Sequence, residues 1–247
     1  MNLSIKSVGL FPHKNKPLSI KKAVETAKIL ESKGVIIKAP EWLDVNQKSF
    51  DIYDSVDAII AFGGDGTVLR TAKKACLSNI PILSINTGKI GYLTTLEENE
   101  FFDADAFISG NFAIERRMML DCRSVDDFFD ICFKDSALNE FVVSKGSLSR
   151  MLDFRLYCGT DGYMEYRADA IIASTPTGST AYSMSAGGAV VDPSLNWLQV
   201  TPICPYTLSG ARHMIFSPES KITVAVAETN NSEAWLTGDG LTSYHLE

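Results

Sequence analysis

Apolar and polar residues follow two different periods along the first ninety residues of the chain. Short apolar runs have the length of a strand, and they lie at residues 4–11, 56–62 and 81–85. Between them, apolar residues recur three or four positions apart, as on one face of a helix, over residues 20–33 and 67–76. Gly34 follows the first of these stretches, where a helix commonly ends. Alternating strands and helices predict a parallel sheet covered by helices, followed by a connecting helix over residues 97–108.

The pattern changes after about Gly110 to short runs rich in β-branched and aromatic residues, separated by turn residues. These runs lie at residues 128–133, 138–143, 153–157, 170–174 and 222–227. Long helical periodicity is scarce there, which predicts an antiparallel, sandwich-like all-β arrangement. We therefore expect an α/β domain with a Rossmann-like parallel sheet over residues 1–96, and a β-rich domain over residues 97–247.

Composition and charge narrow the classes of function. Hydrophobic residues make up 45% of the 247 residues, so the chain can bury a core, and its net charge of −7 argues against nucleic acid or an anionic membrane as partner. No stretch approaches the ~20 apolar residues of a membrane helix. Lys6 interrupts the apolar N-terminus and no small-residue cleavage site follows, so we expect no secretory signal. Five scattered cysteines favour reduced thiols and a cytoplasmic location.

The most informative segment is residues 59–67, where an apolar strand runs into Gly63, Gly64 and Gly66 around Asp65. Glycines at such a turn let backbone N–H groups approach a ligand, and the N-terminus of the following helix favours phosphate. A carboxylate beside phosphates is electrostatically unfavourable, so its presence indicates a specific function. Two roles fit Asp65: it binds Mg²⁺, or it accepts the proton of an attacking hydroxyl group. The simpler alternative is a strand-to-helix turn in which Asp65 hydrogen bonds to local backbone.

Two familiar nucleotide-binding motifs are absent from this turn. Leu69 stands where a third glycine would complete a dinucleotide fingerprint, and the chain has no GxxxxGK[ST] loop. Arg70 lies one turn into the helix, within reach of a phosphate bound at its N-terminus. Considered alone, Arg70 is more simply explained as a solvated helix charge.

A run of hydroxyl residues follows another apolar strand. Residues 170–174 lead into Thr-Pro-Thr-Gly-Ser-Thr-Ala-Tyr-Ser at 175–183, and Ser185 continues the pattern. Small hydroxyl side chains and free amides suit the recognition of ribose and phosphate, and Tyr182 is able to stack on a base. Asp169, just before the strand, is able to accept hydrogen bonds from a ribose or a nicotinamide amide. The structural alternative is a serine-rich turn with Tyr182 in the core.

Asn139 and Glu140 form a polar pair inside the apolar run of residues 137–143. A polar pair in such a run should be hydrogen-bonded or functional, because burying it without partners costs free energy. Its acceptors suit an adenine amine or a ribose diol. The alternative is a solvent-facing pair on a half-buried strand.

These segments together resemble those of NAD kinases. The resemblance rests on Gly-Gly-Asp-Gly-Thr at 63–67, on Asn139-Glu140, and on Asp169 with the run at 175–182. Residues 86–93 resemble the family's Asn-x-Gly-x-Leu-Gly-Phe segment, and residues 204–209 its Cys-Pro-His-Thr-Leu-Ser segment. Lipid kinases and phosphofructokinases carry similar glycine–aspartate loops, so the specificity lies in the combination, which spans residues 58–240.

The resemblance implies an enzyme that transfers the γ-phosphoryl group of ATP to the 2′-hydroxyl of the adenosine ribose of NAD, forming NADP. It implies that Asp65 is the general base and that Gly63, Gly64 and Thr67 form a phosphate loop. It assigns no side chain as a metal ligand. The positions that it implies for NAD binding are Gly66, Arg70, Tyr92, Asn139, Glu140, Arg150, Arg167, Asp169, Thr177, Thr180, Ala181, Tyr182, Ser183 and Ser185.

The same resemblance implies a divalent metal ion, Mg²⁺ or Mn²⁺, that neutralises the triphosphate, with ATP or polyphosphate as donor. It also implies a homo-dimer or homo-tetramer that builds part of each site across subunits. Neither nucleic acid nor a membrane is an expected partner. Two other functions stay open at this point: a lipid or sugar kinase that shares only the glycine–aspartate loop, and a dinucleotide-binding sensor without catalysis.

Overall fold

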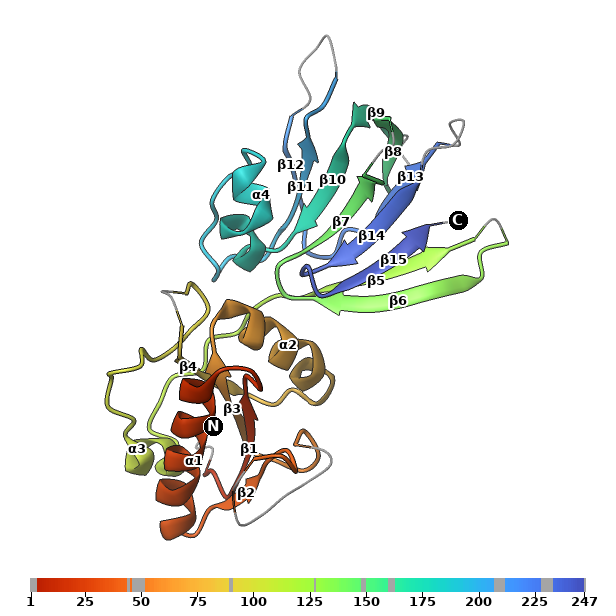
Figure 1. The fold of residues 1–247 in the computed structure, drawn as a ribbon. Helices are drawn as coiled ribbons and strands as arrows, with labels where there is room; N and C mark the ends of the chain where they lie inside the picture. Colours follow the sequence, from red (N-terminus) through yellow and green to blue (C-terminus); the bar gives the residue numbers. More distant parts are fainter. Residues whose placement is uncertain are drawn as a thin grey trace. The chain divides into compact units, whose positions relative to one another are not determined.

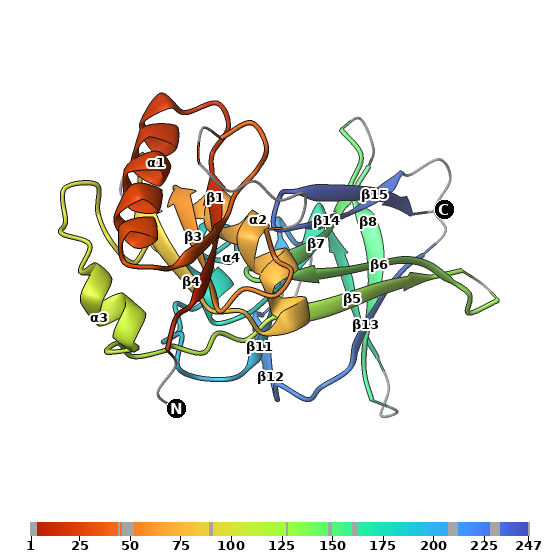
Figure 2. The same ribbon diagram turned by 90° about the horizontal axis from the view of Figure 1, so that it is seen from below.

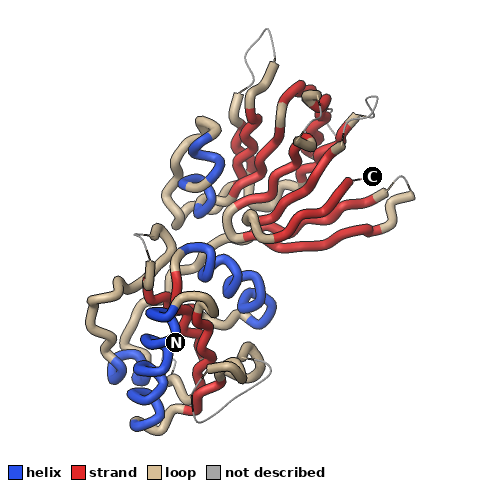
Figure 3. Tube along the Cα trace, in the orientation of Figure 1, coloured by secondary structure: helices blue, strands red, loops and turns tan. Residues whose placement is uncertain are grey.

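Contacts between residues divide the chain into two units, Met1–Ile114 and Glu115–Glu247, which we describe separately. The computed structural model describes residues 4–43, 45, 52–88, 91–126, 128–147, 150–159, 163–206, 212–227 and 233–246. The first unit combines helices with a parallel sheet, and strands dominate the second (Figures 1 and 3). The predicted fold class, an α/β region followed by a sandwich-like all-β region, is confirmed. Within the described residues, no helix is long and apolar enough to span a membrane.

A parallel sheet with the strand order β2-β1-β3-β4 forms the first unit. Residues of β3 are buried along its whole length, as the apolar run predicts. The elements are β1 (Ser7–Pro12), α1 (Pro17–Ser32), β2 (Ile36–Lys38), β3 (Ala58–Gly63), α2 (Asp65–Ala75), the 3₁₀ turn η1 (Cys76–Ser78), β4 (Ile82–Asn86) and α3 (Ala104–Ser109).

Helices cover both faces of this sheet. Side chains of β3 alternate between the two faces, and because they are apolar, each face is buried against a helix. Ile60 and Phe62 pack in the core cluster that includes Ala23, Ala27 and Leu30 of α1. Ile59 points the other way and packs with Ala75 of α2. Figure 1 shows α1 and α2 on opposite sides of β1 and β3. This packing fixes the point at which β3 ends and α2 begins, at Gly63 and Gly64.

The helix predicted over residues 97–108 is shorter than expected and begins at Ala104. Asp103 caps it, because its carboxylate accepts a hydrogen bond of 3.0 Å from the backbone N–H of Ala106. Before the cap, the backbone N–H of Glu97 donates to the side chain of Glu100 at 2.7 Å, which holds a turn instead of a helix. The prediction for residues 97–103 was therefore wrong.

Antiparallel strands make up the second unit. The largest sheet has the order β12-β11-β10-β7-β14-β15, a smaller one the order β13-β8-β9, and β5 pairs with β6. The strands are β5 (Leu120–Val125), β6 (Ile131–Ala137), β7 (Glu140–Lys145), β8 (Leu152–Cys158), β9 (Tyr163–Ala168), β10 (Ala170–Ser174), β11 (Leu198–Ile203), β12 (Met214–Phe216), β13 (Ile222–Val226), β14 (Ala234–Gly238) and β15 (Thr242–Leu246); two short helical turns, η2 (Thr177–Thr180) and α4 (Tyr182–Ser185), follow β10.

The two main sheets of this unit pack face to face. Ile171 of β10 points into the core between them, together with Phe154 of β8 and Val200 of β11. The neighbouring residue Ile172 faces the other side of the large sheet and packs in a cluster with Ala186, just after α4. The β5–β6 hairpin lies beside β14 and β15 (Figure 2). Its apolar side chains, which include Phe133, pack against these two strands.

Two predicted strands of the second unit begin later than expected, and in both cases an aspartate holds the preceding turn. The run at 128–133 starts as a strand only at Ile131, because Asp126 accepts hydrogen bonds from the N–H groups of Phe128 and Asp130. The run at 138–143 starts at Glu140, for the reason given below. Strands β5, β9, β11, β12, β14 and β15 were not predicted.

Candidate functional site

The carboxylate of Asp65 lies at the first turn of α2 and is held by backbone. Its Oδ2 accepts a hydrogen bond of 3.1 Å from the N–H of Tyr92, and its Oδ1 accepts one of 3.0 Å from the N–H of Leu93. These bonds fix the orientation of the carboxylate and leave each oxygen with a lone pair that can accept another hydrogen bond. The structural alternative from the sequence was a hydrogen bond to local backbone; the two backbone donors to Asp65 lie instead 27 and 28 residues later in the chain.

The segment after β4 is shaped to reach Asp65. Asn86 is buried, and its side chain donates to Glu97 at 2.9 Å and accepts from the N–H of Gly88 at 3.0 Å. At Gly91 a side chain would collide with the carboxylate of Asp65, so the chain needs glycine to pass this close. Gly91 therefore acts on the position of Asp65, and Asn86 holds the chain just after β4. Their motif was noticed in the sequence, but neither was among the predicted site residues.

The other predicted residues of the first unit surround the N-terminus of α2. Gly63 is buried against the side chain of Thr67, and no larger residue fits there. Gly64 is the N-cap and offers no side chain to the first turn, while Gly66 is exposed. This helix end therefore keeps the partial positive charge that attracts phosphate. Arg70 is exposed one turn further along, and Tyr92, which is 74% exposed, donates to Asp65 through its backbone N–H.

Asp239 organises the polar pair Asn139-Glu140 in the second unit. Its carboxylate accepts hydrogen bonds from three consecutive backbone N–H groups, those of Leu138 at 2.8 Å, Asn139 at 2.8 Å and Glu140 at 3.1 Å. The amides of Leu138 and Asn139 point at Asp239 and not along a sheet ladder, and β7 begins at Glu140. Asp239 itself has a positive φ of 51° between Gly238 and Gly240. Sequence reasoning did not single out Asp239.

The hydroxyl run after β10 is bonded directly to the same pair. The N–H of Thr175 donates to the carbonyl of Asn139 at 2.9 Å, and the Thr175 hydroxyl donates to the carbonyl of Leu138 at 2.6 Å. Gly178 lies so close to the backbone of Asn139 that a side chain at 178 would overlap it. The structure thus brings together two segments that the sequence indicated separately.

The surroundings of Glu140 disfavour the charged form of its carboxyl group. Its side chain is buried, with the residue 7% exposed, and its Oε2 has no hydrogen-bond partner among the described residues. Burial is the main cause that raises the pKa of Glu140 from 4.5 to about 7; the Asp239 carboxylate adds to it, and a hydrogen bond from the backbone N–H of Tyr182 opposes it. Oδ1 of Asn139 is buried and unpartnered as well. Two buried acceptors without donors are what a ligand carrying hydroxyl or amine donors would satisfy.

The remaining residues of the hydroxyl run have different surroundings. Tyr182 is 48% exposed, so its ring is accessible, contrary to a place in the core. The Ser183 hydroxyl is fully buried and bonds to Gln199 at 2.7 Å and to Thr201 at 3.1 Å, which anchors the turn from beneath. Thr177 is buried, Thr180 and Ala181 are half-buried, and Ser185 is exposed.

Arg150, Arg167 and Asp169 lie at the opposite end of β10 from the hydroxyl run. Asp169 precedes the five-residue strand that Thr175 follows, a separation of six residue steps or about 20 Å at ~3.3 Å per residue. Asp169 pairs with Lys145 at 2.8 Å, and Arg167 lies 3.8 Å from Asp153. Within one unit, the structure therefore does not bring these three residues to Asn139 and Glu140.

A carboxylate fixed at a helix end that attracts phosphate suits the transfer of a phosphoryl group to a hydroxyl, so the class of protein is a kinase with an alcohol group as acceptor. Comparison with known families agrees. The family model of the ATP-NAD kinase N-terminal domain matches residues 11–112, and that of the ATP-NAD kinase C-terminal domain matches residues 138–247. The chain belongs to the ATP-NAD kinase family, whose reaction is the phosphorylation of NAD to NADP.

Individual relatives support this assignment along the whole chain. An NAD kinase of Thermoanaerobacter sp. (strain X514) is 36% identical over 251 residues, covering 98% of this chain and 88% of the relative. The crystal structure of an NAD kinase from Archaeoglobus fulgidus in complex with ATP is 28% identical, with a TM-score of 0.71 over 96% of this chain and 85% of that one. A yeast NADH kinase complexed with NADH, 24% identical, shares the fold with a TM-score of 0.86 over 99% of this chain and 78% of that one. Family membership decides against a lipid or sugar kinase and against a sensor without catalysis.

Proposed function

We propose that the enzyme transfers the γ-phosphoryl group of ATP to the 2′-hydroxyl of the adenosine ribose of NAD, with Asp65 as general base. One observation carries the catalytic part: Asp65 is held by two backbone N–H groups at a helix N-terminus that has no side-chain cap. In that position the carboxylate accepts the hydroxyl proton while the helix end attracts the phosphates. Gly63, Gly64 and Thr67 keep the backbone of the turn close to them.

A divalent metal ion, Mg²⁺ or Mn²⁺, fits this site only together with the nucleotide. Among the described residues, no group of three or more His, Cys, Asp or Glu side chains could hold a metal. Mg²⁺ is often bound by one or two carboxylates plus substrate phosphates, and Asp65 is the carboxylate that the glycine turn offers. When bound, the ion neutralises the charge of the triphosphate oxygens. Arg70, exposed on α2, adds a cation for the phosphates.

The second unit is proposed to bind the adenosine part of NAD. Oδ1 of Asn139 and Oε2 of Glu140 are acceptors that lack donors, and ribose hydroxyls or an adenine amine supply donors of the required kind. The accessible ring of Tyr182 provides a stacking surface beside them. Thr177, Thr180, Ala181 and Ser185 would complete the pocket wall, with Ser183 supporting it from below. In this proposal, residues 1–96 bind the phosphates and carry the catalytic carboxylate, and residues 97–247 bind NAD.

Arg150, Arg167 and Asp169 are proposed to act on NAD bound to a second copy of the chain. The support is their separation from Thr175 by the length of β10. A homo-dimer or homo-tetramer would then build each site from two chains. Mixing Asp65→Asn with Asp169→Ala chains tests this: exchange of subunits should restore activity that neither variant has alone. Mixtures that stay as inactive as their components would contradict a shared site.

The catalytic role is tested with Asp65→Asn. We expect kcat to fall by ~10²–10⁴-fold, because the amide cannot accept the hydroxyl proton, while calorimetry still detects NAD binding. Glu25→Gln, an exposed residue of α1 that pairs with Lys21, is the matched control and should keep the wild-type rate. NADP formation by Asp65→Asn at the wild-type rate would refute the assignment. The same assay with polyphosphate as donor and NADH as acceptor identifies the substrates used.

The cytoplasmic location stays a prediction. It is supported by the five cysteines, which form no disulfide among the described residues.

A further inference from the structure

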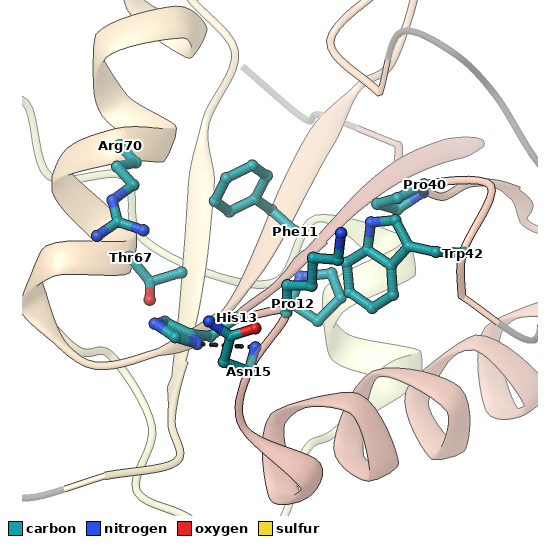
Figure 4. A pocket seen from close by; sticks show the side chains of 9 residues that line it. Phe11, Pro12, His13, Asn15, Pro40, Trp42, Thr67 and Arg70 are labelled. Carbon is teal, nitrogen blue, oxygen red and sulfur yellow. Dashed lines mark hydrogen bonds between the residues drawn. The ribbon is translucent and has the colours of Figure 1, made fainter.

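A cavity of about 270 Å³ opens in the first unit beside α2. In Figure 4, Thr67 and Arg70 of α2 lie on one side of the end of β1, and Pro40 and Trp42 lie on the other. The floor comes from the last residues of β1 and the loop after it. The nine lining residues are Phe11, Pro12, His13, Lys14, Asn15, Pro40, Trp42, Thr67 and Arg70. This volume is just below the ~300–1,000 Å³ of ligand clefts, which suits one ring system better than a whole dinucleotide.

The lining combines flat rings with positive charge. Phe11, His13 and Trp42 supply the rings, Lys14 and Arg70 supply two cations, and no carboxylate is among the nine residues. The indole of Trp42 is 43% exposed, and Trp42 belongs to none of the described core clusters, so its large apolar face is accessible. A planar ring attached to an anionic chain is the ligand class that such a lining recognises.

The cavity adjoins the glycine turn through fixed backbone contacts. The N–H of His13 donates to the carbonyl of Phe62 at 3.0 Å, and the Ser19 hydroxyl donates to the same carbonyl, one residue before Gly63. Thr67 contributes both to the cavity and to the turn. The imidazole of His13 accepts the N–H of Asn15 at Nδ1, so a neutral ring carries its proton on Nε2 as a donor.

We propose that this cavity binds the base of the donor nucleotide, with Trp42 as the stacking surface and Lys14 and Arg70 directed to its phosphates. This inference rests on the proposed function, because it takes ATP as the donor and the glycine turn as the place of its terminal phosphates. A base stacked on Trp42 lies at one side of α2 and leaves the acceptor side, Asp65, free. Trp42 then determines the preference for a nucleoside triphosphate over a donor that has no base.

Trp42→Ala tests the proposal, with Trp42→Phe as the variant that retains a stacking ring and Phe101→Ala as control for loss of an exposed aromatic residue in the same unit. Calorimetry with ADP and with inorganic triphosphate separates base from phosphate recognition. We expect Trp42→Ala to weaken ADP binding and to raise the KM for ATP by about tenfold or more. Triphosphate binding, the KM for NAD and kcat at saturating ATP should stay unchanged, and Trp42→Phe should recover most of the ADP affinity.

The possible failures are distinguishable. If Trp42→Ala binds ADP as tightly as the wild type, the cavity does not hold the base, although NADP formation shows that the kinase function stands. If Trp42→Ala loses triphosphate binding as strongly as ADP binding, Trp42 acts on phosphate or on folding, and the proposal is also overturned. If the wild type forms no NADP, the proposed function fails, while ADP calorimetry on the same variants still reports on the cavity.

Discussion

Replacing Glu140 by glutamine should make the protein more stable and a poorer enzyme. Glu140 is buried beside Asp239, and its pKa is raised from 4.5 to about 7. Glutamine keeps the size of the side chain and removes the charge. At 1.36 kcal/mol per pH unit, the difference between 4.5 and about 7 corresponds to roughly 3 kcal/mol of folding free energy that ionised Glu140 costs the native state.

The sign of the pH dependence follows from the direction of this change in pKa. Below about pH 4 the carboxyl is protonated in both folded and unfolded chains, and Glu140 contributes no dependence on pH. Between 4.5 and about 7 the unfolded chain has released the proton and the folded chain has kept it, so the stability of the wild type falls as pH rises. Above about pH 7 the full cost of ~3 kcal/mol is present.

Urea denaturation measures this effect when wild type and Glu140→Gln are compared from about pH 4 to about pH 8. Fluorescence of Trp197 and Trp235 reports on the second unit. The stability advantage of Glu140→Gln should be small at the acidic end and grow to roughly 3 kcal/mol at the basic end. Glu219→Gln, at an exposed position before β13, is the matched control for loss of a carboxylate, and its effect on stability should stay within about 0.5 kcal/mol at each pH. An advantage of Glu140→Gln that does not change with pH, or a less stable variant at about pH 8, would refute the reasoning.

The same variant should lose kcat/KM for NAD by about tenfold or more, because hydrogen bonds to a charged acceptor contribute ~1.5–3 kcal/mol. A gain in stability combined with a loss in NAD recognition separates ligand binding from folding as the role of Glu140. Wild-type kcat/KM in Glu140→Gln would show that its carboxylate does not contact NAD.

Two further predictions concern the residues that hold the functional carboxylates. Gly91→Ala should lower kcat by about 100-fold with NAD affinity retained, because the added methyl group displaces Asp65; steady-state kinetics with NAD calorimetry checks this, and a normal kcat would contradict it. Asp239→Asn should destabilise the second unit by about 1–3 kcal/mol, because one oxygen that accepts backbone N–H groups becomes a donor. It should also lower the pKa of Glu140, which carboxyl ¹³C NMR measures; unchanged denaturation together with an unchanged pKa would exclude the role given to Asp239.

Local patterns in the sequence determined the fold class and the two segments that matter most. The buried run of β3, the glycines after it and the helical period of α2 lie within twenty residues, so their geometry follows from neighbours in the chain. The same holds for the hydroxyl run after β10, whose predicted strand matches the observed one, Ala170–Ser174. A turn held by a side chain is harder to foresee, since periodicity does not register an aspartate that caps; the helix start at Ala104 was missed for this reason.

Only the tertiary structure decided how the candidate residues are held and which of them lie together. Asp239 bonds to amides 99 to 101 residues away, and Asp65 bonds to amides 27 and 28 residues away. Strand pairing also placed Asp169 at the far end of β10 from Glu140, which sequence order does not reveal. Periodicity records the environment of each residue relative to its neighbours in sequence. Hydrogen bonds across such separations, and the burial that perturbs Glu140, exist only once the chain has folded.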